Sequence, residues 1–181
     1  MVPDEAQIIK RAQSGESAAF GELYEAYFVR IFRYLAFKVG RREDAEDLAQ
    51  AVFIKALESI GTYQSREVPF SSWLFRIAHN QMVDLFRRRN RRPEISLNEE
   101  IPLADDCADP HEELEIKLQN EALLAEVKKL SAAQREVIAL RFAAEMPIAE
   151  VARAMNRSEG AIKALQHSAV ASLRRRLGGQ V

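Results

Sequence analysis

The most concentrated chemical feature of the sequence is a run of five arginines within six residues, Arg87, Arg88, Arg89, Arg91 and Arg92. The run follows an apolar pattern at helical spacing that starts near Trp73. A helix dipole accommodates one or two cations at the C-terminal end, and a solvated helix end is the alternative interpretation. Five clustered arginines create a strong positive electrostatic potential. When they bind the phosphates of a nucleic acid, condensed counterions are released, and this release favours binding. We therefore favour contact with nucleic acid, and Asn80 and Asp84 lie on the same predicted helix.

A second candidate site lies near the C-terminus, where the pattern predicts a helix, a tight turn and a second helix. Ser131 and Gln134 have the spacing of a capping box, and Ser158 has the type and position of a cap for the last helix. Small residues at Gly160 and Ala164 allow close backbone approach, and the helix N-terminus offers free N–H groups to phosphate. These properties suit a recognition helix in a major groove. A generic helical hairpin is the alternative.

Aromatic side chains lie just before the arginine run, at Tyr63, Phe70 and Trp73. An unpaired base can stack on an exposed ring beside basic residues. The alternative is that these rings lie in the hydrophobic core, and this is the favoured interpretation for Trp73. The stretch from Thr62 to Pro69 is predicted to be a polar loop, after which Ser71 or Ser72 caps the next helix.

Two further helices are predicted upstream, from Ser17 to Leu35 and from about Arg42 to Gly61. The second has a predicted buried stripe at Ala45, Leu48, Ala49, Val52, Phe53, Ala56, Leu57 and Ile60, whereas Glu46, Asp47, Gln50 and Lys55 point elsewhere. With no competing strand pattern, the fold class is predicted to be all-α, with two small helical domains.

The net charge of −1 conceals an uneven distribution along the chain. Residues 1–92 hold 15 basic and 12 acidic side chains. Residues 93–113 hold 8 acidic side chains and no basic ones, and residues 114–181 hold 11 basic and 7 acidic side chains. The acidic middle segment contains three of the six prolines, which is typical of a solvated, flexible tether. We therefore predict domains at 1–92 and 114–181 joined by an acidic linker at 93–113.

Several classes of protein are disfavoured. Neither a signal peptide nor a membrane helix is predicted, which points to the cytoplasm. The sequence contains no GxGxxG, P-loop, GxSxG or HExxH motif, so no enzyme and no cofactor are expected. His79, His111 and His167 lack metal-ligand spacing, so no metal site is expected. Cys107 has no internal partner for a disulfide, and an acidic stretch disfavours its thiolate.

Three segments together resemble the extracytoplasmic-function (ECF) sigma factors of the sigma-70 family. They are DAEDLAQAVFIKAL (Asp44 to Leu57), WLFRIAHNQMVDLFRR (Trp73 to Arg88), and LSAAQREVIALRF with IAEVARAMNRSEGAIKAL (within Leu130 to Leu165). The resemblance implies two helical domains, region 2 and region 4, and a role in promoter recognition by RNA polymerase. Core RNA polymerase, promoter DNA and an anti-sigma factor are the implied partners.

The resemblance also implies roles for individual residues. The polymerase-binding set is Glu46, Asp47, Leu48, Gln50 and Phe53. The set facing the minus-10 element, where a flipped base would be captured, is Tyr63, Phe70, Trp73, Asn80, Asp84, Arg87, Arg88 and Arg91. The set facing the minus-35 element is Arg157, Ser158, Glu159, Gly160, Lys163, Ala164 and His167.

The chain departs from the family pattern at Ala51, where an acidic residue is usual, and at Ala164, Leu165 and Ser168 in the recognition helix. A stand-alone helix-turn-helix regulator and a helical interaction module are the competing hypotheses. The regulator leaves the Asp47 and Gln50 surface unexplained. The interaction module leaves the arginine run unexplained.

Overall fold

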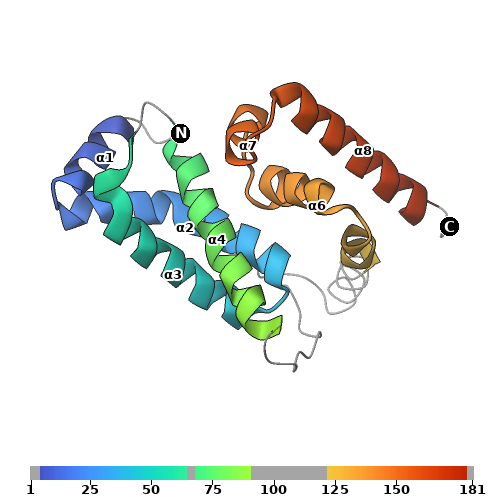
Figure 1. Cartoon of the computed structure of the whole chain (residues 1–181), viewed down its shortest axis with the longest axis horizontal. Coiled ribbons are helices and arrows are strands. Elements are labelled where there is room, and N and C mark those ends of the chain that lie inside the picture. The colour runs from blue at the N-terminus through green and yellow to red at the C-terminus, as the bar shows by residue number, and fades with distance from the viewer. Residues whose placement is uncertain (1–4, 65–67, 91–121, 179–181) are drawn as a thin grey trace, which may run out of the picture.

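A computed structural model describes residues 5–64, 68–90 and 122–178 (Figure 1). Its elements are α1 (Glu5–Gln13), α2 (Ser17–Val39), α3 (Arg42–Ser59), the 3-10 turn η1 (Ile60–Thr62), α4 (Phe70–Asn90), a helix over residues 122–128, α6 (Ala132–Ile138), the π-helical turn η2 (Ala139–Ala143), α7 (Ile148–Ala154) and α8 (Glu159–Leu177). All regular structure in these ranges is helical, which confirms the predicted fold class. The predicted linker at 93–113 lies outside the described residues, as do Cys107 and His111. Within the described ranges, no helix has the length and apolarity needed to cross a bilayer.

The ends of several helices follow directly from local sequence. At the end of α2, Gly40 adopts a left-handed conformation (φ 78°), which glycine tolerates without steric cost. Ser131 and Gln134 form both hydrogen bonds of the predicted capping box before α6. The Ser158 hydroxyl accepts a hydrogen bond from the backbone N–H of Ala161 at the start of α8, as predicted.

The N-terminal half is organised by α2, against which α3 and α4 pack. Its core contains Leu23, Ile31, Tyr34, Leu35, Val52, Phe70, Leu74 and Phe75. Gly61 lies in η1, directly after α3 ends at Ser59, as expected for the C-terminal end of that helix. The expected cap at Ser71 or Ser72 was wrong, because α4 already begins at Phe70, so that both serines lie inside it and are buried.

The C-terminal half packs α6, α7 and α8 around Val137, Leu140, Val151 and Ile162. Pro147 is the N-cap of α7. A second cluster, which includes Ile138, Ala169 and Leu173, joins α6 to α8. In Figure 1, α8 lies on the opposite side of the molecule from α3, and α2, α4, α6 and α7 lie between them.

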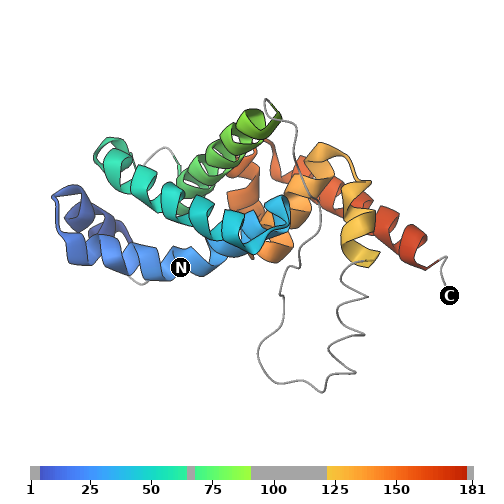
Figure 2. The ribbon, with the colours of Figure 1, turned by 90° about the horizontal axis from the view of Figure 1, so that it is seen from below.

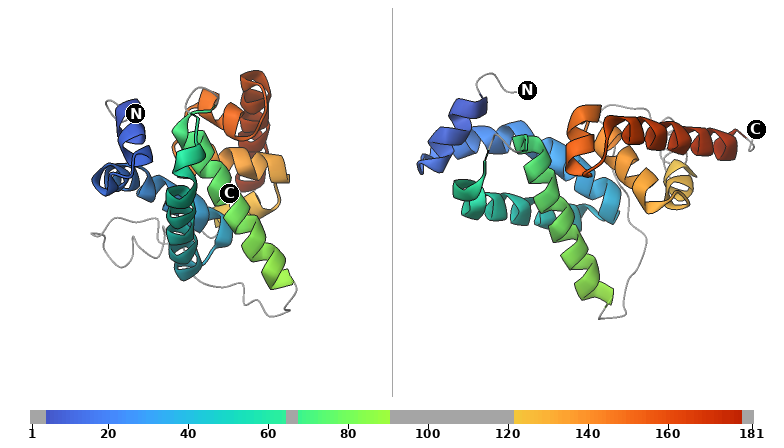
Figure 3. Two further views of the ribbon diagram at one scale, coloured as in Figure 1. Left: turned by 60° about the vertical axis from the view of Figure 1, so that its left-hand side comes forward. Right: turned by 45° about the horizontal axis from the view of Figure 1, so that its top comes forward.

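The two halves are packed against each other in this structure. Side chains of α2 and α4 join those of η2 and α7 in one continuous buried cluster, in which Met146 is fully buried. Figures 2 and 3 show α4 alongside the C-terminal half from three further directions. This contact could not be predicted from the sequence, because it joins segments that lie far apart along the chain.

Candidate functional site

The outer face of α3 presents the polar residues predicted to contact polymerase. Asp47 and Gln50 are exposed, one turn apart on the same helix face. Glu46 is half-buried and accepts a 2.8 Å hydrogen bond from Arg42. This face therefore offers an unengaged carboxylate and a carboxamide to a partner.

The two apolar residues predicted for that face are not exposed in this structure. Leu48 and Phe53 are buried, and the Phe53 ring packs against Tyr24 and Phe28 of α2, so neither side chain can meet a partner without unfolding. Conversely, Leu57 was expected in the buried stripe but is 54% exposed, and Ile54 is 61% exposed. Both follow Gln50 at helical spacing, which is the signal that sequence reasoning missed.

On α4, Asn80, Arg87 and Arg88 are exposed, as a surface facing DNA requires. Arg87 donates a 2.8 Å hydrogen bond to the Asp84 carboxylate, so part of its charge is neutralised within one turn. Arg91 lies outside the described residues. Within the described part of α4, Arg88 is therefore the cation most available to phosphate.

The aromatic residues upstream form a packed cluster rather than an open stacking platform. Tyr63 is 7% exposed and Phe70 is buried, and their rings meet edge to face at 5.5 Å. The Tyr63 hydroxyl donates a hydrogen bond to the Val68 carbonyl, and burial raises the pKa of Tyr63 to about 12. Because stacking needs an exposed face, Tyr63 and Phe70 offer none in this structure. Trp73 is half-buried against both rings.

The start of α8 agrees best with the predicted site. All seven residues predicted to face the minus-35 element are exposed, namely Arg157, Ser158, Glu159, Gly160, Lys163, Ala164 and His167. The opposite face is anchored by Ile162, Ala169 and Leu173, which are buried. The helix therefore presents one continuous exposed strip that begins at its N-terminus, where backbone N–H groups attract phosphate.

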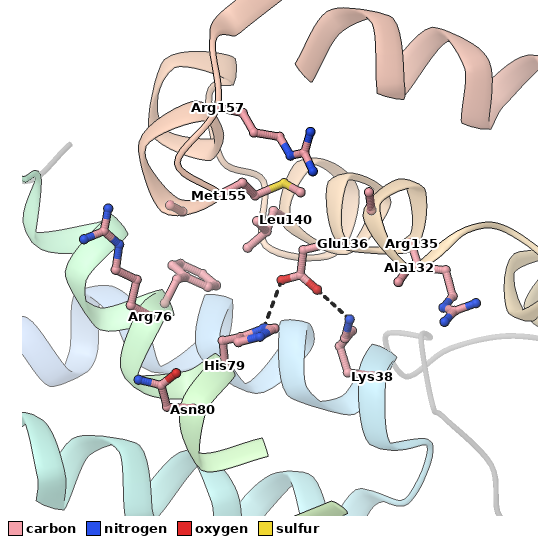
Figure 4. Close-up of a pocket in the computed structure, with 13 residues that line it drawn as sticks. Lys38, Arg76, His79, Asn80, Ala132, Arg135, Glu136, Leu140, Met155 and Arg157 are labelled. Atoms are coloured by element: carbon pink, nitrogen blue, oxygen red, sulfur yellow. Dashed lines mark hydrogen bonds and ion pairs between the residues drawn. The ribbon is translucent and has the colours of Figure 1, made fainter. Parts of the chain in front are cut away.

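A cavity of about 650 Å³ lies between the two halves. Asn80 and Arg157, which belong to different predicted DNA-facing surfaces, both line it (Figure 4). Glu136 lies at its centre between Lys38 and His79. The residues that the structure describes contain no cluster of His, Cys, Asp and Glu side chains able to hold a metal ion.

The fold and these surfaces define a class of protein, an all-helical chain whose C-terminal part is a helix-turn-helix and whose N-terminal part has a separate exposed polar face on α3. Family models agree with this class. The model for sigma-70 region 2 matches residues 23–92, and the model for sigma-70 region 4 matches residues 127–175. The chain therefore belongs to the sigma-70 family, and its relatives place it among the ECF sigma factors.

Among these relatives, the ECF RNA polymerase sigma factor BldN of Streptomyces coelicolor is 39% identical over 171 residues. The match covers 94% of this chain and 65% of BldN, so this chain spans slightly less than two thirds of that relative. The ECF RNA polymerase sigma factor SigW of Bacillus subtilis is 28% identical over 180 residues, which cover 93% of this chain and 94% of SigW.

Two solved structures share the fold. CnrH, solved in complex with the cytosolic domain of CnrY, aligns with a TM-score of 0.71 at 24% identity, over 96% of this chain and 97% of CnrH. The sigma factor RpoE from Bartonella quintana, solved in complex with the anti-sigma factor NepR, aligns with a TM-score of 0.69 at 21% identity. That alignment covers 88% of this chain and 96% of RpoE.

Proposed function

We propose that this chain is a promoter-specificity subunit that directs core RNA polymerase to particular promoters and assists melting of the minus-10 element. The observation that carries the proposal is the presence of two separate exposed surfaces in one chain of this family, the outer face of α3 and the N-terminal strip of α8. A stand-alone DNA-binding regulator needs only the second. That alternative is not favoured, because it does not explain the exposed polar and apolar residues on the outer face of α3.

For the polymerase contact we propose a revised set of residues, Asp47 and Gln50 with Ile54 and Leu57. The two polar groups supply directional hydrogen bonds, and the two exposed aliphatic side chains supply apolar area that becomes buried on binding. Leu48 and Phe53 act indirectly by packing α3 against α2. The surface is therefore a small apolar patch beside a carboxylate, a combination suited to a protein partner.

For DNA we propose two contacts with different chemistry. Asn80, Arg87 and Arg88 on α4 face the minus-10 element, where positive charge holds the phosphate backbone and the polar side chain meets a base as the strands part. The start of α8 lies in the major groove at the minus-35 element, with Arg157 and Lys163 as its cations. The pocket for an extruded base must be built from the exposed residues around the buried Tyr63 and Phe70 rather than from those rings.

We further propose that the protein has no catalytic activity of its own, acts in the cytoplasm with RNA polymerase, and is held inactive by an anti-sigma factor. The support is membership of the ECF sigma factors. For the anti-sigma factor, the support is that CnrH and RpoE were solved with the CnrY cytosolic domain and with NepR, respectively.

The proposed polymerase face is tested by a pull-down of core RNA polymerase with three forms of the chain. The wild type should retain core enzyme, and Asp47→Ala with Gln50→Ala should lose it. The control Glu25→Ala removes one carboxylate from an exposed position of α2 and should retain core enzyme. Circular dichroism of each form establishes that the fold is kept.

A second pair of variants tests the revised apolar contacts. Ile54→Ser with Leu57→Ser should weaken core binding about tenfold or more, because interface anchors of this kind contribute about 1–2 kcal/mol each. Run-off transcription on a genomic library then tests promoter selection directly. A chain that binds duplex DNA tightly by itself and ignores core enzyme would overturn the proposal in favour of a stand-alone regulator.

A further inference from the structure

We infer that Gln13 of α1 is a positioning residue for base capture at the minus-10 element, because its carboxamide fixes the start of the loop between η1 and α4. The inference rests on the proposed function, in which the residues around the buried Tyr63 and Phe70 receive an extruded base. The region 2 match begins at residue 23, so α1 lies before the matched residues. The inference therefore gives this N-terminal helix a part in promoter recognition.

The Gln13 carboxamide joins α1 to two backbone carbonyls beyond the end of α3. Its nitrogen donates hydrogen bonds to the Ile60 carbonyl at 2.9 Å and to the Tyr63 carbonyl at 2.8 Å. Ile60 begins η1 and Tyr63 directly follows it, and the two bonds use both N–H groups of the carboxamide. Gln13 and Ile60 are 47 residues apart in the chain, and Figure 1 shows α1 beside the end of α3.

The two carbonyls need donors from another part of the chain. The last carbonyls of a helical segment have no partner within that segment. Within η1 the Ile60 carbonyl accepts the Tyr63 N–H at 3.0 Å. Tyr63 then takes an extended conformation (ψ 132°), so the helix does not continue and supplies no further donor there. Gln13 provides these donors from α1 and caps the segment from outside.

Tyr63 connects this anchor to the far end of the loop. Its hydroxyl donates a 2.7 Å hydrogen bond to the Val68 carbonyl, just before α4. Its ring packs against Phe70 and Trp73, with centroids 5.5 and 5.1 Å away. The backbone of Tyr63 is thus held by α1, while its side chain holds the chain that enters α4. Gln64 follows Tyr63 and is exposed, so the two anchors determine where this polar side chain starts.

α1 is itself held firmly enough to support the loop. Ile8, Ile9 and Ala12 are buried in the core of the N-terminal half. Arg11 donates hydrogen bonds of 2.8 and 3.2 Å to the carboxylates of Glu16 and Glu22, which ties α1 to the beginning of α2. An anchor on a packed helix orders a loop before its ligand arrives, and such preorganisation strengthens binding of the correct ligand.

A positioning role and a purely structural role predict different results. If Gln13 only stabilised the fold, its removal would lower transcription from every promoter by the same factor. If Gln13 positions the loop, its removal weakens the preference for the captured base, because specificity is a difference between the affinities for the correct and the incorrect base. The ratio between promoters therefore separates the two roles.

The experiment measures base discrimination by the holoenzyme formed from core polymerase and the full chain. Each minus-10 base of a promoter recovered by run-off transcription is replaced in turn, and transcription from the original and the substituted promoters is compared. Gln13→Leu removes both donors and keeps a side chain of similar size. The largest ratio should fall about tenfold, as expected for the loss of two hydrogen bonds. Gln13→Lys restores a donor group and should retain most of the ratio.

A matched control distinguishes the anchor from the rest of α1. Gln7→Leu makes the same substitution at an exposed position of α1 and should leave the ratio unchanged. Each variant should bind core polymerase as the wild type does. If Gln13→Leu does not fold by circular dichroism, Gln13→Ala provides the readout. The inference is overturned by a wild-type ratio in Gln13→Leu, by an equal loss on all promoters, or by a loss in Gln13→Lys as large as in Gln13→Leu.

The failure of this inference and the failure of the proposed function are distinguishable. A wild-type chain that does not bind core polymerase refutes the sigma function. Hydrogen exchange in the free chain then still decides whether the anchor exists, since the Tyr63 N–H should exchange about tenfold faster in Gln13→Leu. An unchanged exchange rate refutes the anchor. Conversely, promoter-directed transcription with an unchanged ratio refutes the role of Gln13 and leaves the sigma function intact.

Discussion

Region 2 and region 4 present their functional residues by different structural means. In region 2 the exposed residues lie in the middle of long helices, and their orientation depends on how α2, α3 and α4 pack together. In region 4 they lie at the first turns of α8, where a single serine hydroxyl fixes the helix start. A surface at a helix end is therefore determined locally, whereas a surface along a helix in a bundle depends on how the neighbouring helices pack.

The two proposed partner surfaces also differ in the chemistry of their exposed groups. The α3 face joins an acidic and an amide side chain to two exposed aliphatic residues, which suits a protein partner. The start of α8 has small residues and free backbone donors, which suit a close approach to phosphate. The two proposed surfaces therefore suit different kinds of ligand.

The largest effect is expected from breaking the aromatic core beneath the surface of region 2. Phe70→Ala should lower the free energy of unfolding by about 3–5 kcal/mol, because the ring is buried among Tyr27, Tyr63 and Trp73. Phe142→Ala in region 4 is the control, since that ring is 55% exposed, and it should cost much less. Equal losses in urea titrations of the two variants would contradict the packing role of Phe70.

A smaller, pH-dependent change in the free energy of unfolding is expected from Glu136, which lies at the junction between the two halves. Burial alone would raise the pKa of Glu136, but His79, Lys38 and Tyr34 outweigh it and hold the pKa at about 2, against 4.5 for a free carboxyl group. A carboxyl group with a lowered pKa stabilises the packed form above pH 4.5 and loses that contribution as the pH falls toward 2.

The difference in unfolding free energy between wild type and Glu136→Gln should therefore be a few kcal/mol near neutral pH and shrink below pH 4.5. Denaturant titrations at several pH values measure it. A difference that stays constant from pH 6 to pH 3 would show that Lys38, His79 and Tyr34 do not lower the pKa of Glu136.

A change of about 1 kcal/mol in the free energy of unfolding is expected from the N-terminal cap of α8 in region 4. Ser158→Ala removes the hydrogen bond to the Ala161 N–H and should lower the free energy of unfolding by that amount. The same variant should weaken binding to a minus-35 duplex, since the first turn of α8 frays. Ser172→Ala, on the same helix beyond its first turns, provides the control and should leave both quantities nearly unchanged. Unaltered stability in Ser158→Ala would mean that packing, not the cap, fixes the start of α8.

The smallest effect is expected from single arginines of α4. Arg88→Ala should reduce the slope of log K against log salt for promoter binding by roughly one, which is the contribution of one phosphate contact. Arg87→Ala should reduce it less, because Asp84 already neutralises part of its charge. Binding measurements between 50 and 200 mM salt, a range in which phosphate contacts are strongly screened, compare the two variants. Equal slopes for both would contradict the proposed difference in availability.

The helical class, the capping box at Ser131 and the cap at Ser158 could be predicted from the sequence. So could the exposure of the seven residues predicted between Arg157 and His167. The caps depend on residues within one turn of each other and the exposed strip follows helical periodicity, so local spacing is sufficient to predict them. The family resemblance also followed from short segments in sequence order, and the family models at residues 23–92 and 127–175 agree with it.

The exposure of the α3 side chains and the contacts of the α4 serines depend on how distant helices pack together. Phe53 and Leu57 share one amphipathic helix, but Phe53 is covered by Tyr24 and Phe28 of α2, whereas Leu57 remains 54% exposed. Ser71 was predicted to cap a helix and instead contacts Glu150, 79 residues away. Such contacts depend on the relative placement of distant helices, and helical periodicity contains no information about that placement.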